Sequence, residues 1–320
     1  MPLYQASEVT ISSGAAGTLN QVIDRLQTVS VNYAPPRTDV RVLGKFNQLR
    51  DRPVINYTPA SFSVQYLKST KDIEANLGIV NSTGVGIAFA NTDGLSVAGF
   101  GARNLTVLVS PSQNNNYNGQ MILRSGVINS YSLSASVGQP AQISFGGEAL
   151  DLRFEVNNNA KVAPGYSAQL VESETIAISG IDVSGFGLSG LTIQSFDLGI
   201  NFTRQSAFQL GTKFPKRLVT DINASLSLKG FFEGINSSFT GLNVYDCGSA
   251  YTGTMFFTLV PSCSTAPSTT YAVVNPYLDS FAYGAQVGSF SSIDLNFSIP
   301  ISVNSGEAVA SYSGSNLIIL

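Results

Sequence analysis

The amino-acid sequence predicts an all-β chain made of two tandem homologous β-sandwich or barrel domains, with at most one short helix in each domain. Three observations support this prediction. Two segments each occur twice in the same order, turn-forming residues replace charged residues in the composition, and no helical period of ordinary length is sustained anywhere. The repeats carry the most weight, because a missed internal repeat leads to the wrong fold.

The first repeat is a strand, a charged loop and a second strand. It runs from Leu26 to Leu67 and again from Ile193 to Phe232. Hydrophobic residues alternate with polar ones on both sides of each loop, which is the period of a β-strand. Three short anchors align the two copies with gaps between them: Asn32-Tyr33 with Asn201-Phe202, Leu43-Gly44 with Leu210-Gly211, and Phe62-Ser63-Val64 with Leu226-Ser227-Leu228.

The second repeat lies downstream in each half of the chain. Residues 128–145 align with residues 278–295 without a gap. The identical pairs are Ser130/Ser280, Ala135/Ala285, Val137/Val287, Gly138/Gly288 and Ile143/Ile293. Two repeats in the same order and at similar separations predict a duplicated domain, and chance similarity between two β-rich segments is the alternative.

Composition agrees with a β-rich fold. Charged residues make up 12% of the 320 residues, against about 25% in an average soluble domain. Gly, Ser, Thr and Asn take their place, and Gly and Asn supply the backbone angles that turns require. The hydrophobic fraction of 43% argues against disorder. The length allows two domains that each bury a core.

The repeats and the composition together set the expected domain boundaries. We expect an N-terminal arm at 1–20, a first β-domain at 21–156, a linker at 157–185, a second β-domain at 186–305 and a C-terminal arm at 306–320. The linker is assigned because it begins with the turn-rich sequence NNNAKVAPGY. The chain ends in four apolar residues, which we expect to be paired or docked, since a free apolar end favours aggregation.

Two segments in the first half of the chain fit the pattern of the short helix. Apolar residues between Thr18 and Leu26 recur at helical spacing, and Thr18 is placed to cap them. Ser69 is placed to cap a two-turn helix that carries Ile73 and Leu77 on one face and stops at Gly78.

The residue types exclude several kinds of chemistry. The chain has no histidine, which excludes Ser-His-Asp and Cys-His nucleophiles and histidine-ligated metals. Cys247 and Cys263 are too few for a four-cysteine zinc site; a disulfide and a reduced pair both remain open, and a cytoplasm favours the reduced pair. No pair of carboxylates stands out as a glycosidase pair. We therefore expect no enzyme activity and no catalytic, metal or cofactor site.

One stretch matches a nucleotide-binding pattern. The segment from Gly185 to Gly190 fits G-x-G-x-x-G, but that pattern binds phosphate only where a helix follows it. Here the following residues alternate like a strand, so we expect the glycines to form a turn or a close strand approach. Basic residues are too few and too interleaved with acids for a strong DNA-binding face.

The chain shows no apolar run of the length that a bilayer requires, and no signal peptide at its start, so we expect no membrane partner and assembly in a cytoplasm. Its charges are distributed unevenly. No Lys or Arg follows Lys229, while five carboxylates do. Nine basic residues gather instead in and beside the two repeated loops: Arg37, Arg41, Lys45, Arg50, Arg52, Arg204, Lys213, Lys216 and Arg217. Ordinary solvated loops are one interpretation; a basic edge that meets an acidic edge of another subunit is the other.

The second charged loop carries a resemblance to a known family. Arg204, Leu210-Gly211 and Arg217 form the pattern R-x₅-LG-x₅-R, which an alternating strand follows. The first loop repeats it more loosely with Arg37, Leu43-Gly44 and Arg52. This pattern resembles the tail tube proteins and related tail proteins of long-tailed bacteriophages, over about a quarter of the chain.

The resemblance implies a structural virion protein of the tail. Its β-sandwich domains would join sheets edge to edge, and two domains per chain would give trimeric rings with pseudo-sixfold symmetry. Stacked rings would form the tube through which DNA is ejected, enclosing the tape measure protein and DNA without binding them specifically. The nine basic residues would then make contacts between rings.

Two alternatives remain open at this point. Another virion ring or cap protein, such as a baseplate, tail-terminator or capsid-decorating protein, would share the same construction. A carbohydrate-binding receptor-recognition β-protein is the second alternative, although the chain has no Trp for the usual sugar-stacking platform.

Overall fold

The structure is a computed structural model of the whole chain. It describes residues 7–13, 20–23, 25–37, 40–41, 49–51, 58–69, 103–109, 119–156, 178–184, 191–207, 210, 216–232, 254–261, 269–274, 276–285, 291–299, 310–313 and 317–318. Within these ranges the chain is all-β, with no helix, and its named strands pair antiparallel. The predicted fold class is therefore confirmed at this level.

The strands of the first half are β1 (Ser7–Ser13), β2 (Asn20–Val22), β3 (Leu26–Asn32), β4 (Val40–Arg41), β5 (Leu49–Asp51), β6 (Ala60–Leu67), β7 (Arg103–Val109), β8 (Gly119–Ser136) and β9 (Gln142–Val156). Those of the second half are β10 (Ile178–Ser184), β11 (Leu191–Ala207), β12 (Lys216–Phe232), β13 (Thr254–Pro261), β14 (Thr269–Val274), β15 (Tyr277–Gly284), β16 (Ser291–Ile299), β17 (Ala310–Ser313) and β18 (Leu317–Ile318).

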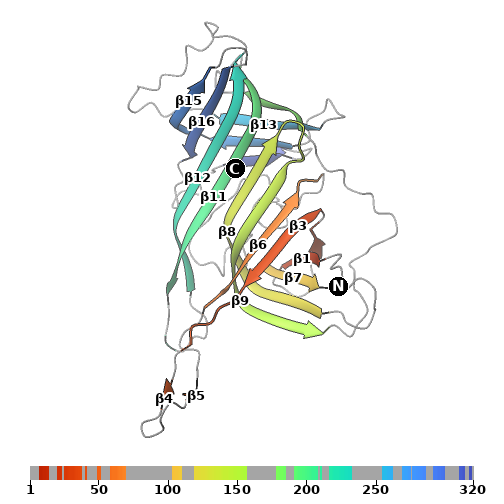
Figure 1. Cartoon of the computed structure of the whole chain (residues 1–320), viewed down its shortest axis with the longest axis vertical. Coiled ribbons are helices and arrows are strands. Elements are labelled where there is room, and N and C mark those ends of the chain that lie inside the picture. The colour runs from red at the N-terminus through yellow and green to blue at the C-terminus, as the bar shows by residue number, and fades with distance from the viewer. Residues whose placement is uncertain are drawn as a thin grey trace, which may run out of the picture.

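Eight of these strands form one continuous run of the sheet (Figure 1). In the first half the order is β3-β6-β9-β8, which we call the first unit. In the second half the order is β11-β12-β16-β15, which we call the second unit. β8 pairs with β11 and joins the two units, so that β3 lies at one end of the run and β15 at the other.

The two units share their pairing register as well as their strand order. Leu26 opposes Tyr66 across a β-bulge in the first unit, and Ile193 opposes Gly230 across a β-bulge in the second. The β8–β9 and β15–β16 pairs are also interrupted at matching points, after Ile128 and after Leu278. Bulges fix a register because they leave one residue unpaired. The strands of the two units therefore correspond residue by residue.

This register corrects one of the three sequence anchors. The anchor of Phe62-Ser63-Val64 with Leu226-Ser227-Leu228 agrees with the register of β6 and β12, whereas Leu43, Gly44 and Gly211 lie outside the described residues. Asn32 of β3 opposes Ser61 of β6, and at the corresponding position of the second unit Gly199 of β11 opposes Ser225 of β12. Asn32 therefore corresponds to Gly199, and its alignment with Asn201 is wrong by two residues. A shift of two keeps every side chain on the same face, and hydrophobic pattern alone does not detect it.

A second layer of strands covers one face of this run. Behind the second unit lie β10, β13 and β14, with β17 and β18 beyond them. The ring of Phe196 lies 5.4 Å from that of Phe257 and 6.2 Å from that of Tyr271, measured between centroids. In the first half, β7, β1 and β2 extend from the N-terminal part of β8, and Val9 and Ile23 are buried there.

The structure differs from the expected layout in two details and agrees with it in a third. Asn20–Val22 is a strand paired with β1, so the helix predicted from Thr18 to Leu26 is wrong. β10 occupies the end of the range expected to be a linker. The apolar C-terminus is paired as expected, since Ile318 opposes Tyr312. The helix predicted after Ser69 lies outside the described residues.

The segment with the nucleotide-binding pattern is followed by β11 and not by a helix, as the alternation predicted. Cys247, Cys263 and most of the interior of both charged loops also lie outside the described residues.

Candidate functional site

The junction between the two units is the first feature that bears on function. Seven consecutive residues of β11, Ser195 to Asn201, oppose seven of β8, Ser130 to Ser136. Leu198 opposes Leu133, and Ile200 opposes Tyr131, with all four side chains at most 5% exposed. The units are thus joined by a full antiparallel ladder with an apolar face.

Arg204 adds a side-chain clamp to this junction. Its Nε donates a hydrogen bond to Oδ1 of Asn129 at 3.0 Å, and its Nη2 donates to the carbonyl oxygen of Ile128 at 3.2 Å. The guanidinium also lies 6.0 Å from the ring centroid of Phe202. Hydrogen bonds from a charged donor are stronger than neutral ones, so Arg204 helps fix the register of β8 on β11.

Among the strands that the structure describes, each of the two outer strands of the run, β3 and β15, is paired along one side only. Within the described residues, β3 pairs only with β6, and β15 pairs only with β16. An outer strand presents unpaired backbone groups and can pair with another chain. Natural proteins protect such a strand with charged residues, Pro or β-bulges. Each of these two strands has a bulge at its pairing, and β15 carries Asp279, but neither strand contains Lys or Pro.

The outer strand β15 carries apolar side chains at the positions where its counterpart β8 carries buried ones. Phe281 and Tyr283 correspond in register to Tyr131 and Leu133 of β8. Phe281 and Tyr283 are each 49% exposed, whereas Tyr131 is 5% exposed and Leu133 is fully buried. At the other end of the run, Tyr33 follows β3 and is 47% exposed. Both ends of the run therefore present aromatic surface.

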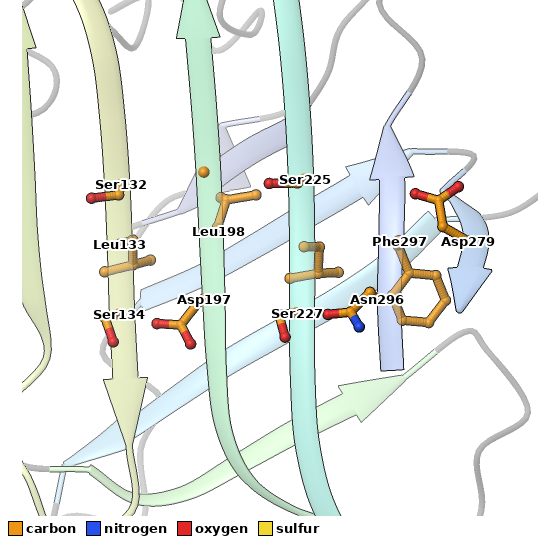
Figure 2. A pocket seen from close by; sticks show the side chains of 12 residues that line it. Ser132, Leu133, Ser134, Asp197, Leu198, Ser225, Ser227, Asp279, Asn296 and Phe297 are labelled. Carbon is orange, nitrogen blue, oxygen red and sulfur yellow. The ribbon is translucent and has the colours of Figure 1, made fainter. Parts of the chain in front are cut away.

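The face of the run opposite the second layer is polar. Figure 2 shows it across β8, β11 and β12, where Ser134, Asp197 and Ser227 lie along one face while strands of the second layer cross behind. The side chains form a shallow open depression of ≈ 310 Å³. Near its edge Oγ of Ser298 donates a hydrogen bond to Oδ1 of Asp279 at 2.8 Å. Hydroxyls, amides and carboxylates cover this face, and Lys229 is an exposed cation on the same side of β12.

Six of the nine basic residues predicted as contacts are described by the structure, and five of these six lie in the hairpins β4–β5 and β11–β12. Lys216 and Arg217 begin β12 opposite Ala207 and Ser206. Arg41 lies in β4 and Arg50 in β5, a hairpin at the lower tip of Figure 1. Arg204 differs, because it bonds to β8 within the chain. Arg37 is exposed beyond β3, and Lys45, Arg52 and Lys213 lie outside the described residues.

Sequence reasoning missed the outer strands as candidate sites. Phe281 and Tyr283 alternate with small residues in the same way as any half-buried strand. The signal that could have found them is the ungapped repeat itself, once it is known that the equivalent strand β8 is buried against β11.

No protein-family model matches the chain, and no curated protein matches it significantly. Among the described residues, no group of three His, Cys, Asp or Glu side chains is placed to hold a metal ion. The described part of the chain also contains no helix long and apolar enough to span a membrane.

Proposed function

We propose that this chain is a structural virion protein, a tail tube subunit of a long-tailed bacteriophage, built from a duplicated β-domain. Copies associate into rings through their sheet edges, and the rings stack into the conduit for DNA. The observation that carries the proposal is the junction of β8 with β11, which joins two units of identical strand order and register and leaves β3 and β15 at the ends.

The matching registers support duplication more strongly than the sequence repeat does. Strand order alone recurs in many β-proteins, but two bulges at corresponding places are a much more specific coincidence. A duplicated unit that pairs with its own copy is a head-to-tail arrangement, and such arrangements continue as closed rings or open helices.

The hairpin ends support stacking of one ring on the next. The β4–β5 hairpin lies beyond the strands of the run at the lower tip of Figure 1, and it and the paired ends of β11 and β12 carry basic residues. A basic hairpin end that meets acidic residues of the next ring would set the orientation of stacking.

The polar face supports the role of a conduit. Among the described residues, Asp197, Asp279 and Asp294 provide carboxylates on and beside this face, and Lys229 is a cation on it. Like charges prevent a polyanion from adhering, so a face of hydroxyls and carboxylates lets DNA slide. We assign this face to the lumen of the tube.

Negative-stain electron microscopy of the purified chain, with light scattering after size exclusion, tests the proposal. Stacked rings are the expected result. Isolated closed rings would favour a terminator or baseplate protein, and a monomer at high concentration would overturn every assembly function. Charge reversal of both Lys216 and Arg217 to Glu should leave rings intact and prevent stacking; normal stacks would remove this hairpin from the ring-to-ring contact.

A further inference from the structure

We propose that β15 of one copy pairs antiparallel with β3 of the next copy, in the register that β8 and β11 use within the chain. The proposal rests on the assembly function above and names its junction: Phe281 opposite Tyr33, Tyr283 opposite Val31, and Ala285 opposite Val29. The partner is a second copy of this chain.

The register follows from positions already fixed by the bulges. β15 corresponds to β8, so Phe281 takes the place of Tyr131 and Tyr283 that of Leu133. β3 corresponds to β11, so Val31 takes the place of Leu198, which opposes Leu133. Replacing each residue of the β8–β11 ladder by its counterpart gives the ladder between copies.

The exposed aromatic residues at the two ends meet in this arrangement. Phe281 and Tyr33, which are 49% and 47% exposed in the single chain, become a directly opposed pair. Aromatic cross-strand pairs are among those that stabilise a sheet. Val29 and Val31 are half-buried on β3 and would be covered by Ala285 and Tyr283. The junction therefore buries the apolar surface that a single copy leaves exposed.

The side-chain clamp also has a counterpart, and here it becomes an ion pair. Arg37 lies at the same distance along the chain from the β3 bulge as Arg204 does from the β11 bulge. Asn129, which accepts the hydrogen bond from Arg204, corresponds to Asp279 of β15. Both Arg37 and Asp279 are exposed. We therefore assign Arg37 to a contact with Asp279 of the next copy, within a ring and not between rings.

Pairing of β15 with β3 of the same chain is excluded by their positions. Six strands separate them in the run, and Figure 1 places them at its opposite ends. The acceptor for each outer strand is thus another molecule. Because the two edges differ, each junction is head to tail, which suits a ring.

Site-directed disulfide formation tests the register. In a background with both native cysteines changed to Ser, the double variant Tyr283→Cys/Val31→Cys should give a ladder of covalent oligomers on a non-reducing gel. The matched control is Tyr283→Cys/Val29→Cys, which is displaced by two residues, about 7–8 Å in a sheet and too far for a disulfide. A ladder from the control and none from the first pair would overturn the register.

Charge exchange tests the clamp. Arg37→Asp and Asp279→Arg should each raise the concentration needed for assembly by about tenfold or more, since like charges would then face each other. The double exchange should restore assembly. Asp221→Arg, the same charge change on an exposed residue of β12, should have no effect. Failure of the double exchange to restore assembly would overturn the assigned pair.

The assembled state is read on the same samples by electron microscopy, which separates the two levels of the proposal. Rings or tubes that form without a cross-link at Tyr283/Val31 would refute this junction and leave the assembly function standing. A chain that stays monomeric at high concentration would refute both.

Discussion

Gly147 offers a strong test of the packing in the first unit. It lies in β9 opposite Ile128, next to the bulge, and a Cβ atom added there would overlap the carbonyl oxygen of Val127. The same Cβ would lie 2.8 Å from Cζ of Phe62 and 3.0 Å from the carbonyl carbon of Val127. Backbone atoms cannot rotate away, so Gly147→Ala must displace one strand from another.

The expected cost lies at the upper end of the range for overpacking, about 3 kcal/mol in the free energy of unfolding. The matched control is Gly199→Ala, whose Cβ would meet only Oγ of Ser225, at 3.3 Å. Ala there also restricts the unfolded chain, which favours folding by about 0.4–1 kcal/mol. We therefore expect Gly199→Ala to change stability by less than about 1 kcal/mol.

Urea unfolding of dilute protein, followed by circular dichroism, measures the difference. With a urea m-value of about 3 kcal/mol/M, Gly147→Ala should lower the midpoint by about 1 M relative to the control. Phe62→Leu removes the ring contact but has a cost of its own in the core, so the double variant should be less destabilised than the sum of the two single variants. Equal midpoints for the two glycine variants would refute the close approach of β8 and β9 at this point, and a double variant no less stable than Phe62→Leu alone would refute the backbone overlap.

Three further substitutions probe the core and the junctions. Leu133→Ala should lower the unfolding free energy by about 2–5 kcal/mol. Tyr283→Ala, at the corresponding half-exposed position of β15, should leave the stability of the dilute monomer nearly unchanged and weaken assembly. Equal destabilisation of the two variants in thermal melts would contradict the difference in burial between these positions. Arg204→Ala removes two charge-assisted hydrogen bonds and should lower the unfolding free energy, measured by urea titration, by about 1–2 kcal/mol. An unchanged unfolding free energy would mean that these hydrogen bonds do not stabilise the junction. Phe196→Ala should cost about 3–5 kcal/mol, against almost nothing for Phe154→Ala, whose side chain is 77% exposed, and comparable losses in calorimetry would refute the assignment of Phe196 to the core.

The strand pattern was predictable because the side-chain period of a strand is two. Alternation in the first repeat placed Phe62, Val64 and Tyr66 on one face, and all three are buried. The alignment of Asn32 was wrong for the same reason, because a slip of two residues preserves that alternation. Only the bulges, which depend on pairing between distant strands, distinguish the two registers.

The short segment around Val22 and Ile23 shows the limit of local periodicity. A few apolar residues at mixed spacing fit a helix and a strand equally well. The choice is made by tertiary pairing, since Thr10 of β1 opposes Val22 and the backbone N–H of Ile23 donates to the carbonyl oxygen of Val9 at 2.8 Å. Nothing in the local sequence encodes that partner.

The candidate site was only partly predictable, because charge is visible in a sequence and edge position is not. The basic loops were predicted as contacts from their composition, and this stays a prediction. The second repeat aligned β15 with β8, but it did not show whether Phe281 is buried or exposed, since that depends on which strand lies beside it. That neighbour is decided by the pairing of β8 with β11, which are distant in sequence.

The covalent connection between the two units has a consequence for assembly kinetics. If a ring is made of such units, every second unit-to-unit junction forms inside one chain. That junction forms at an effective concentration set by the connecting segment, in the millimolar range for short flexible tethers, whatever the amount of protein in the cell. Growth then requires a bimolecular encounter only for the β15–β3 junctions, so a ring closes with half as many collisions as one built from single units.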